Sequence, residues 1–213
     1  MTILLPLTTL NIKHLVISNK LTIVENTIKQ KGLLIVEHQD IADFWLTAGP
    51  KKWWMKDDVF DSEIAAKFST THRAAANGEL DHWINEPDSA LALILVLDQF
   101  SRNLFRNDTR AFAQDAACLT IVKTVMFKGF DRSMNPEIGP FCYLPLMHSE
   151  TIEDQQSCLQ EMRRIDQKDY IKAAQQHLDI IGKFGRFPHR NSVLGRKTTV
   201  AEQAYLDSGG FSG

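Results

Sequence analysis

The chain has 213 residues and a formal net charge of −2, with 44% hydrophobic and 23% charged residues. These values are typical of a soluble globular domain, and they exclude a disordered, collagen-like or disulfide-framework protein. A near-neutral charge also removes the simplest argument for nucleic-acid binding, which needs a concentrated basic face, so we expect no nucleic-acid partner.

The cysteines and the first residues indicate a cytoplasmic protein. Cys118, Cys142 and Cys158 share no CxxC spacing, and an odd thiol favours a reduced compartment. Residues 1–12 contain no Lys or Arg, and Pro6 divides their apolar run, which is unlike a signal peptide. No uncharged apolar run approaches the length that spans a bilayer, so we expect no membrane partner.

Residues 1–37 differ in composition from the rest of the chain. They are rich in Ile, Leu, Val and Thr, which leaves two interpretations: two short strands, or an irregular, poorly ordered N-terminal extension. Residues 38–213 are predicted to form one helical domain.

The first half of that domain contains three predicted helices. Ile41, Phe44 and Trp45 fit one face of a short helix that ends before the breaker pair at 49–50. Residues 57–76 have the spacing of an amphipathic helix. The third helix opens at 87–89 and includes residues 90–97, which are apolar all round, so this helix is predicted to be central and covered.

The second half contains four more predicted helices. One is capped at Asp108 or Thr109 and runs to residue 128, with Gly129 as its stop. A second is opened by a capping pattern at Thr151, and a third carries a buried stripe over 170–184. The fourth is opened by Thr199, with Glu202 at the capping spacing. About seven or more helices with short connections, and no convincing strands after residue 40, predict an all-α fold.

The first polar cluster ends the apolar helix. Asp98 and Arg102 are four residues apart, so on a helix they share a face, and Asn103 follows them. Because buried charge must be matched, one interpretation is a structural salt bridge. The other is an acid that orients an arginine toward a ligand.

The second cluster is His148 with Glu150, at a junction between two helices. A histidine and a carboxylate could serve as metal ligands or as an acid/base pair, although the spacing is unspecific. The structural alternative is that His148 bonds a backbone carbonyl while Glu150 takes a capping or turn role.

The third cluster combines cations with a stiff turn. Pro188 has no amide donor and favours an extended conformation at the residue before it. Arginine forks match carboxylate and phosphate geometry, so one interpretation is an anion clamp, and the other is a loop whose arginines tie down helix carboxyl ends. The polar residues are Arg186, His189, Arg190, Asn191, Arg196 and Lys197.

The remaining features point to packing. Trp53 and Trp54 are expected to cover a small core, and Phe105, Phe112 and Phe127 are expected to be core residues. The sequence has no phosphate-binding glycine loop, no GxSxG, no HExxH and no zinc-type Cys/His set, so we predict no cofactor and no metal.

Three strings, LALILVLDQFSRNLFRND, FCYLPLMHSE and FGRFPHRNSVLGRKTT, resemble the bacterial DUF924 family, which is named for its unknown function. The resemblance runs from about Ile41 to Leu206 and implies a compact, TPR-like, all-helical fold. Where family members often have proline after the DQF triplet, this chain has Ser101. The residues at motif positions are Asp98, Arg102, Asn103, His148, Glu150, Arg186, His189, Arg190, Asn191 and Arg196.

These motif residues are predicted to converge on one polar pocket that binds a small anionic ligand, a carboxylate or phosphate, or an acidic peptide terminus. The expected ligand-binding residues are Asp98, Arg102, Asn103, Arg186, Arg190, Asn191 and Arg196. If the protein is an enzyme, His148 or His189, with Glu150, would supply acid/base chemistry for a hydrolase or lyase.

Two alternatives stay open from the sequence. One is a non-catalytic, TPR-like interaction module whose motif residues are structural. The other is a metal-dependent hydrolase that uses His148, Glu150 and His189. The sequence also leaves open whether the protein is an enzyme and whether it forms a homo-oligomer.

Overall fold

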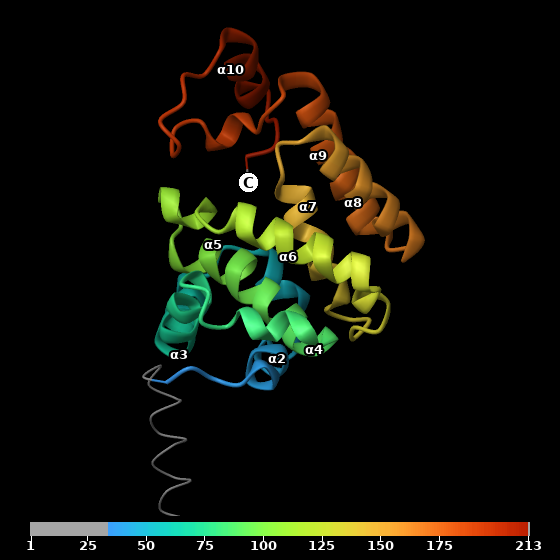
Figure 1. Cartoon of the computed structure of the whole chain (residues 1–213). Helices are drawn as coiled ribbons and strands as arrows, with labels where there is room; N and C mark the ends of the chain where they lie inside the picture. The colour runs from blue at the N-terminus through green and yellow to red at the C-terminus, as the bar shows by residue number, and fades with distance from the viewer. Residues whose placement is uncertain (1–33, 213) are drawn as a thin grey trace, which may run out of the picture.

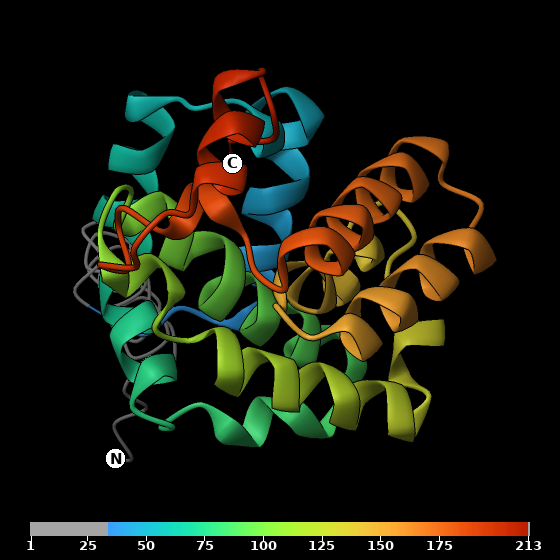
Figure 2. The same ribbon diagram turned by 90° about the horizontal axis from the view of Figure 1, so that it is seen from above.

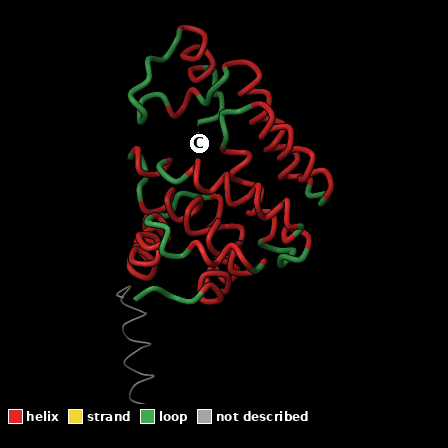
Figure 3. Tube along the Cα trace, in the orientation of Figure 1, coloured by secondary structure: helices red, strands yellow, loops and turns green. Residues whose placement is uncertain are grey.

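The computed structural model describes residues 34–212, and every regular element in this range is helical (Figures 1 and 3). The predictions of an all-α fold and of about seven or more helices are therefore confirmed. Most of the expected N-terminal extension, residues 1–33, lies outside the described residues. The α-helices are α2 (His38–Trp54), α3 (Asp58–Ala76), α4 (Pro87–Ile94), α5 (Ser101–Leu104), α6 (Asp115–Lys128), α7 (Leu144–His148), α8 (Ile152–Arg164), α9 (Lys168–Phe184) and α10 (Val200–Asp207).

Helix α4 is the centre of the molecule, as its uniformly apolar sequence predicts. Every residue from Ala90 to Leu97 is buried. The helix continues into a π-helical turn over Leu95–Phe100 and then into α5. A π-helical turn adds a residue to each hydrogen-bonded ring and so changes where side chains point, and such turns are frequent at functional sites.

Aromatic side chains from several helices pack around this central element. The ring of Phe100 lies 5.7 Å from that of Trp45 and 4.9 Å from that of Phe68. Trp53 stacks on Trp45 at 6.1 Å and donates its indole N–H to the Trp45 carbonyl oxygen at 2.8 Å. Trp53 is thus a packing residue, as predicted, whereas Trp54 is half exposed over Phe141.

Two helices end at glycines, and one begins at a capping box, where the sequence predicts. Gly129 ends α6 with φ = 70°, and Gly185 ends α9 with φ = 69°, a left-handed conformation that glycine adopts without strain. Thr199 and Glu202 form the predicted capping box of α10. These stops fix where the loops that carry polar residues begin.

One prediction about local structure is confirmed here and two others are wrong. The first helical run of α2 ends at the predicted breaker pair, because Gly49 has the non-helical angles φ = 71° and ψ = 174°, and a second run follows this kink as far as Trp54. The stacking of Trp53 on Trp45 holds its last turn in place. Thr151 precedes α8 but makes no side-chain cap, and its amide donates to the Ser149 hydroxyl at 3.2 Å.

The second error concerns Phe127, which is 93% exposed rather than part of the core. The buried face of α6 is formed by Cys118, Val122 and Val125, and residue 127 falls on the opposite side of the helix. Phe105 and Phe112, predicted as core, are half buried.

Helices α8 and α9 pack closely against each other beside the central bundle, and the chain then crosses to α10 (Figure 2). A small second core formed by Ile180, Ile181 and Phe187, with Tyr205 and Phe211 against it, joins α9 to the segment around α10. No helix among residues 34–212 is long and apolar enough to cross a membrane.

Candidate functional site

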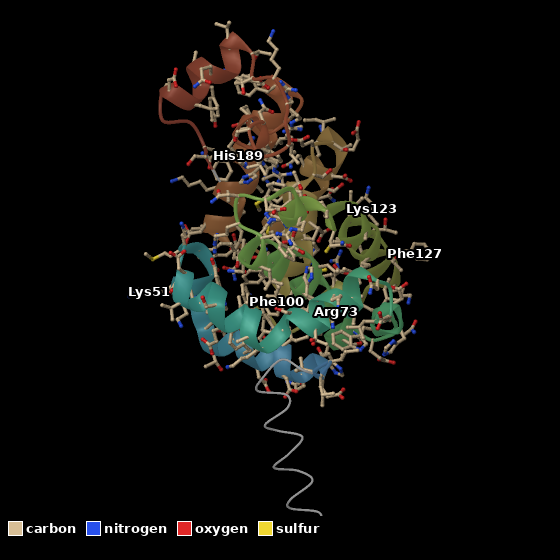
Figure 4. All side chains as sticks on the ribbon, turned by 90° about the vertical axis from the view of Figure 1, so that its left-hand side faces the viewer. Lys51, Arg73, Phe100, Lys123, Phe127 and His189 are labelled. Carbon is tan, nitrogen blue, oxygen red and sulfur yellow. The ribbon has the colours of Figure 1, made fainter. Side chains whose placement is uncertain are left out.

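Three polar segments that are distant in the sequence meet at the C-terminal end of the buried helix. Asp98 lies in the π-helical turn, His148 ends α7, and Arg190 lies in the short turn after α9. Hydrogen bonds and electrostatic contacts join them to their neighbours. We call this group the central cluster: Asp98, Arg102, Asp115, His148, His177, His189 and Arg190. Figure 4 labels His189 where the C-terminal segment approaches the bundle.

The Asp98 carboxylate anchors the central cluster. It is 1% exposed, and its Oδ1 lies 2.8 Å from Nδ1 of His148 while its Oδ2 accepts from Gln99 Nε2 at 2.6 Å. Burial alone would raise the pKa of Asp98, but the charge of Arg102 and the hydrogen bond with His148 hold it well below its usual value. The carboxylate is therefore ionised at neutral pH and accepts the Nδ1 proton of His148.

His148 is consequently held in one tautomer. With Nδ1 donating to Asp98, the Nε2 atom carries the lone pair. Burial, followed by the charge of Arg102, lowers the pKa of His148 against the opposing effect of Asp98, so the imidazole is neutral at pH 7. The side chain is 17% exposed and can be reached from solvent.

The junction between α7 and α8 fixes the backbone of His148. Gln155, a fully buried residue of α8, donates Nε2 to the carbonyl oxygens of Met147 at 2.6 Å and Ser149 at 2.7 Å. These bonds satisfy the otherwise unpaired carbonyls at the end of α7. No local pattern in the sequence identifies Gln155, because its role depends on how α8 folds back against the end of α7.

Asp115 links the two arginines of the central cluster. Arg102 Nη1 donates to the Asp98 backbone oxygen at 2.9 Å and forms an ion pair with Asp98 Oδ1 at 2.9 Å, while its Nη2 donates to Asp115 Oδ1 at 3.1 Å. Arg190 Nη1 lies 3.5 Å from Asp115 Oδ2, a longer contact. The salt bridge of the first interpretation is therefore present, and Asp98 also orients His148.

Arg190 is the least satisfied charge in the cluster. It is 7% exposed, and its guanidinium lies 4.5 Å from the ring centre of Phe187 and 4.9 Å from that of Phe112. Its Nε is buried and has no hydrogen-bond partner among the described residues. Burial and the charge of Arg102 lower the pKa of Arg190 to about 10, so it stays protonated at neutral pH.

The central cluster contains two more histidines, His177 and His189, close to Arg190. The Nδ1 atom of His177 lies 2.8 Å from the Ala173 carbonyl oxygen and donates to it, and Nδ1 of His189 is buried without a partner among residues 34–212. Burial lowers the pKa of each to about 4, and the charge of Arg190 adds to the shift at His189. The site prediction omits His177, because its place in an apolar stripe identifies it only as a buried residue.

Glu150 is turned away from acid/base chemistry by its partners. Arg196 binds it with two hydrogen bonds, of 2.7 and 3.0 Å, and the Phe187 amide donates to it at 2.8 Å. Burial alone would raise the pKa of Glu150, but these bonds lower it. The pair clamps the loop after α9 to the α7–α8 junction, a structural arrangement that leaves Glu150 an ionised acceptor.

A second paired carboxylate holds the same loop to α10. Glu202 accepts from Arg186 at 2.6 and 2.9 Å and from Asn191 at 3.3 Å. The Arg186 bonds and the Thr199 amide lower the pKa of Glu202 to about 2. Asn191 also accepts from Arg196 at 3.0 Å. Arg186, Asn191 and Arg196 therefore use these hydrogen bonds within the chain rather than facing the central cluster.

Asn103 points to another neighbour. Its Nδ2 donates to Asp61 Oδ1 at 2.7 Å, and Arg106 bonds the same carboxylate. These contacts tie α5 to α3. Asn103 thus belongs to a helix contact rather than to the central cluster.

The structure gives little support for metal or thiol chemistry at this site. Among residues 34–212 there is no group of three His, Cys, Asp or Glu side chains that could hold a metal ion. His148, Glu150 and His189 therefore do not form the predicted alternative metal set. Cys118, Cys142 and Cys158 are buried, and burial raises the pKa of each thiol.

The residues of the central cluster are buried or half-buried. A hollow of about 800 Å³ runs along α9 and a smaller one of about 180 Å³ lies beside Tyr143, and neither is lined by a residue of the cluster. A ligand that reaches Arg190 must therefore displace something that now covers it.

Comparisons with known proteins give a family but no activity. A family model described as "Bacterial protein of unknown function (DUF924)" matches residues 41–210. The solved structure of a protein of unknown function from Agrobacterium tumefaciens is 40% identical with a TM-score of 0.78, and the match covers 80% of this chain and 97% of that one. None of the curated proteins compared with the chain matches it.

Proposed function

This chain belongs to the DUF924 family, and we propose from its geometry that it binds a small carboxylate or phosphate at Arg190, beside a histidine that transfers protons. The observation that carries the proposal is the buried Asp98–His148 pair, joined at 2.8 Å, next to an arginine whose charge is incompletely paired.

The anion part of the proposal rests on the partners that Arg190 lacks. Within the described residues its Nε is buried without a partner, and its contact to Asp115 is long at 3.5 Å. A buried donor left unpaired costs about 1–3 kcal/mol, more when it is charged. A carboxylate or phosphate oxygen would satisfy this donor, because guanidinium groups bind such oxygens in strong, charge-assisted hydrogen bonds.

The catalytic part rests on His148. Its neutral Nε2 can accept a proton from water, whose oxygen then attacks a carbonyl or phosphoryl group of the anionic substrate. The ionised Asp98 carboxylate stabilises the imidazolium that forms, and the same imidazole returns the proton to the leaving group. In a lyase the same atom would instead take a proton from a carbon next to the substrate carboxylate, a double bond would form to the neighbouring carbon, and the leaving group on that carbon would depart with its bonding electron pair.

A non-catalytic, TPR-like interaction module is the second candidate. It is favoured by the pairs Glu150–Arg196 and Arg186–Glu202, whose strong hydrogen bonds within the chain suit a structural role. This candidate explains the loop after α9 but leaves Arg190 and His189 without an explanation.

Thermal melting with and without inorganic phosphate and acetate tests the anion site. Wild type should melt at a higher temperature as either anion is added, because binding to the folded state stabilises it. Arg190→Gln should lose this shift, while Arg73→Gln, which changes an exposed arginine of α3, should keep it. Equal shifts in all three proteins, or no shift in wild type, would contradict the proposal.

A further inference from the structure

A second group of charged side chains lies at the far end of α8, outside the central cluster. The junction that holds His148 comes at the start of α8, whereas Arg164 is the last residue of that helix. At a rise of 1.5 Å per residue the two ends of α8 are roughly 18 Å apart, so this group is separate from His148. We call it the Asp131 cluster: Asp131, Arg132, Tyr143, Glu161 and Arg164.

Donors in the Asp131 cluster converge on one carboxylate oxygen. The Tyr143 hydroxyl donates to Asp131 Oδ2 at 2.7 Å, and Arg132 Nε donates to the same oxygen at 3.0 Å. Arg164 Nη2 lies 3.6 Å from this oxygen and donates to the Tyr143 hydroxyl at 2.6 Å. Burial, together with the bond to Asp131, raises the pKa of Tyr143, so its hydroxyl keeps the proton that it donates.

The other oxygen of Asp131 has no such partner. The side chain is 2% exposed, and its Oδ1 accepts no hydrogen bond from any residue within 34–212. A buried carboxylate oxygen is stable only when it is hydrogen-bonded. Asp131 lines the cavity of about 180 Å³ beside Tyr143, so a group bound in this cavity is positioned to donate to Oδ1.

The same cavity is lined by two arginines that keep a donor without a partner. Arg132 and Arg164 have side chains that are 55% and 34% exposed. Both use Nε and Nη2 within the Asp131 cluster, whereas Nη1 of each makes no hydrogen bond in the described part of the chain. Guanidinium donors of this kind bind carboxylates through charge-assisted hydrogen bonds.

The charges of the Asp131 cluster favour a ligand that carries both signs. Two carboxylates, Asp131 and Glu161, balance the two arginines Arg132 and Arg164. The arginines would repel a simple cation, and the carboxylates would repel a simple anion. A molecule with an ammonium group and a carboxylate matches both the acceptor of Asp131 and the donors of the arginines.

The size and walls of the cavity limit the rest of the ligand. At about 30 Å³ for each water-sized group, a volume of 180 Å³ holds about six non-hydrogen atoms. The walls between the charged groups are mainly apolar, which suits a short aliphatic side chain. These wall residues are Met134, Pro136, Gly139, Pro140 and Ile165.

We propose that this cavity binds a small zwitterionic amino acid of about the size of alanine. Its ammonium group donates to Asp131 Oδ1, and its carboxylate accepts from Arg132 and Arg164. The donors gathered on Oδ2 hold the Asp131 carboxylate in place and leave Oδ1 to the ligand. This site is separate from the one proposed at Arg190 and does not depend on it.

L-Alanine, ethylamine and propionate are matched probes, because ethylamine lacks the carboxylate of alanine and propionate lacks its ammonium group. Binding to the full chain is measured by NMR titration. The signals followed are the backbone amides of Gly139 and Gln167 at the cavity, and those of Phe187 and His189 at the central cluster. We expect alanine to shift the cavity amides and to bind there about tenfold more tightly than either other probe.

Arg164→Gln and Arg163→Gln are a matched pair, because these arginines are neighbours in α8 and only Arg164 lines the cavity. Arg164→Gln should weaken alanine binding about tenfold, whereas Arg163→Gln should leave it unchanged. Asp131→Asn should abolish binding. Since the buried Asp131 also supports the fold, Arg132→Gln, which changes a half-exposed side chain, tests the same site with less effect on folding.

Equal affinities of the three probes at the cavity would overturn this inference, as would alanine binding that persists in both Arg164→Gln and Arg132→Gln. Alanine shifts confined to Phe187 and His189, or no binding of alanine to wild type, would overturn it as well. The site at Arg190 is tested separately with phosphate and acetate, so these outcomes leave that proposal standing.

Discussion

Asp98 shows how one buried carboxylate can organise a site. It bonds His148, Arg102 and Gln99 at 2.6 to 2.9 Å while being 1% exposed. A buried charge is tolerated only when such partners surround it, and the partners in turn lose their orientation without it. The same interactions that stabilise the carboxylate therefore fix the histidine proposed to transfer protons.

Asp98→Asn tests this dependence at nearly constant volume. The amide cannot balance the charge of Arg102, so we expect the free energy of unfolding to fall by about 2–4 kcal/mol. Urea denaturation of the variant and wild type at pH 7.5 measures the change. Asp43→Asn, which alters an exposed carboxylate of α2, should stay within about 0.5 kcal/mol of wild type. Equal stability of all three proteins would show that the pairing contributes nothing.

At the scale of the element, two glycines near the end of α9 differ in whether another residue could replace them. Gly182 lies inside α9, and a Cβ there would meet no atom within 4 Å. Gly185 follows the last residue of α9 at φ = 69°, where L-residues are strained. One position is thus open to a side chain, while the other needs the conformational freedom of glycine.

The pair Gly182→Ala and Gly185→Ala turns this difference into a measurement. Gly182→Ala should raise the free energy of unfolding by about 0.5–1 kcal/mol, because alanine favours the helix and restricts the unfolded chain. Gly185→Ala should lower it by about 1 kcal/mol, because alanine is forced into the left-handed region. Denaturant midpoints at neutral pH report both changes. The same sign for both variants would contradict the argument.

Elements of this kind follow from local signals, and the sequence predicts them well. The stops at Gly129 and Gly185 and the capping box at Thr199 depend on neighbours within a few residues, and all three are confirmed. The end of the first helical run at Gly49 and Pro50 follows from the same kind of local signal, since Gly49 lies outside helical φ/ψ.

The candidate site is less predictable because it is made of long-range contacts. Motif positions identify Asp98, His148 and Arg190. Nothing local predicts that they meet, because 50 residues separate Asp98 from His148 and 42 separate His148 from Arg190. The π-helical turn that directs Asp98 and the buried place of His177 both depend on tertiary packing. The contacts of Phe211 with His177 and His189 are missed for the same reason, since nothing near residue 211 indicates these distant partners.

At the scale of the whole molecule, the C-terminal segment is attached by charge as much as by apolar packing. Glu150–Arg196 joins it to the α7–α8 junction, and Glu202 joins its loop to α10, while only a small second core lies beneath. The histidines His177 and His189 lie where this segment meets the bundle. Their ionisation should therefore weaken the association of the two parts.

Acid should destabilise the protein in a window set by these histidines. The pKa values of His177 and His189 are lowered to about 4 by burial, against 6.5 for an exposed histidine. Between these values the unfolded chain binds protons that the folded chain does not, so the free energy of unfolding falls as the pH falls from 6.5 toward 4. The slope is at most about 1.4 kcal/mol per pH unit for each histidine.

Urea unfolding at pH 7.5, 6.5, 5.5 and 5.0 measures that slope. This range lies above the lowered pKa values of Asp98 and Glu202, so those carboxylates stay ionised and contribute little to it. His177→Gln should reduce the slope, because one group no longer takes up a proton on unfolding. A wild-type stability that is flat or rises from pH 6.5 to 5.0 would mean that these imidazoles are not neutral and buried in the folded protein.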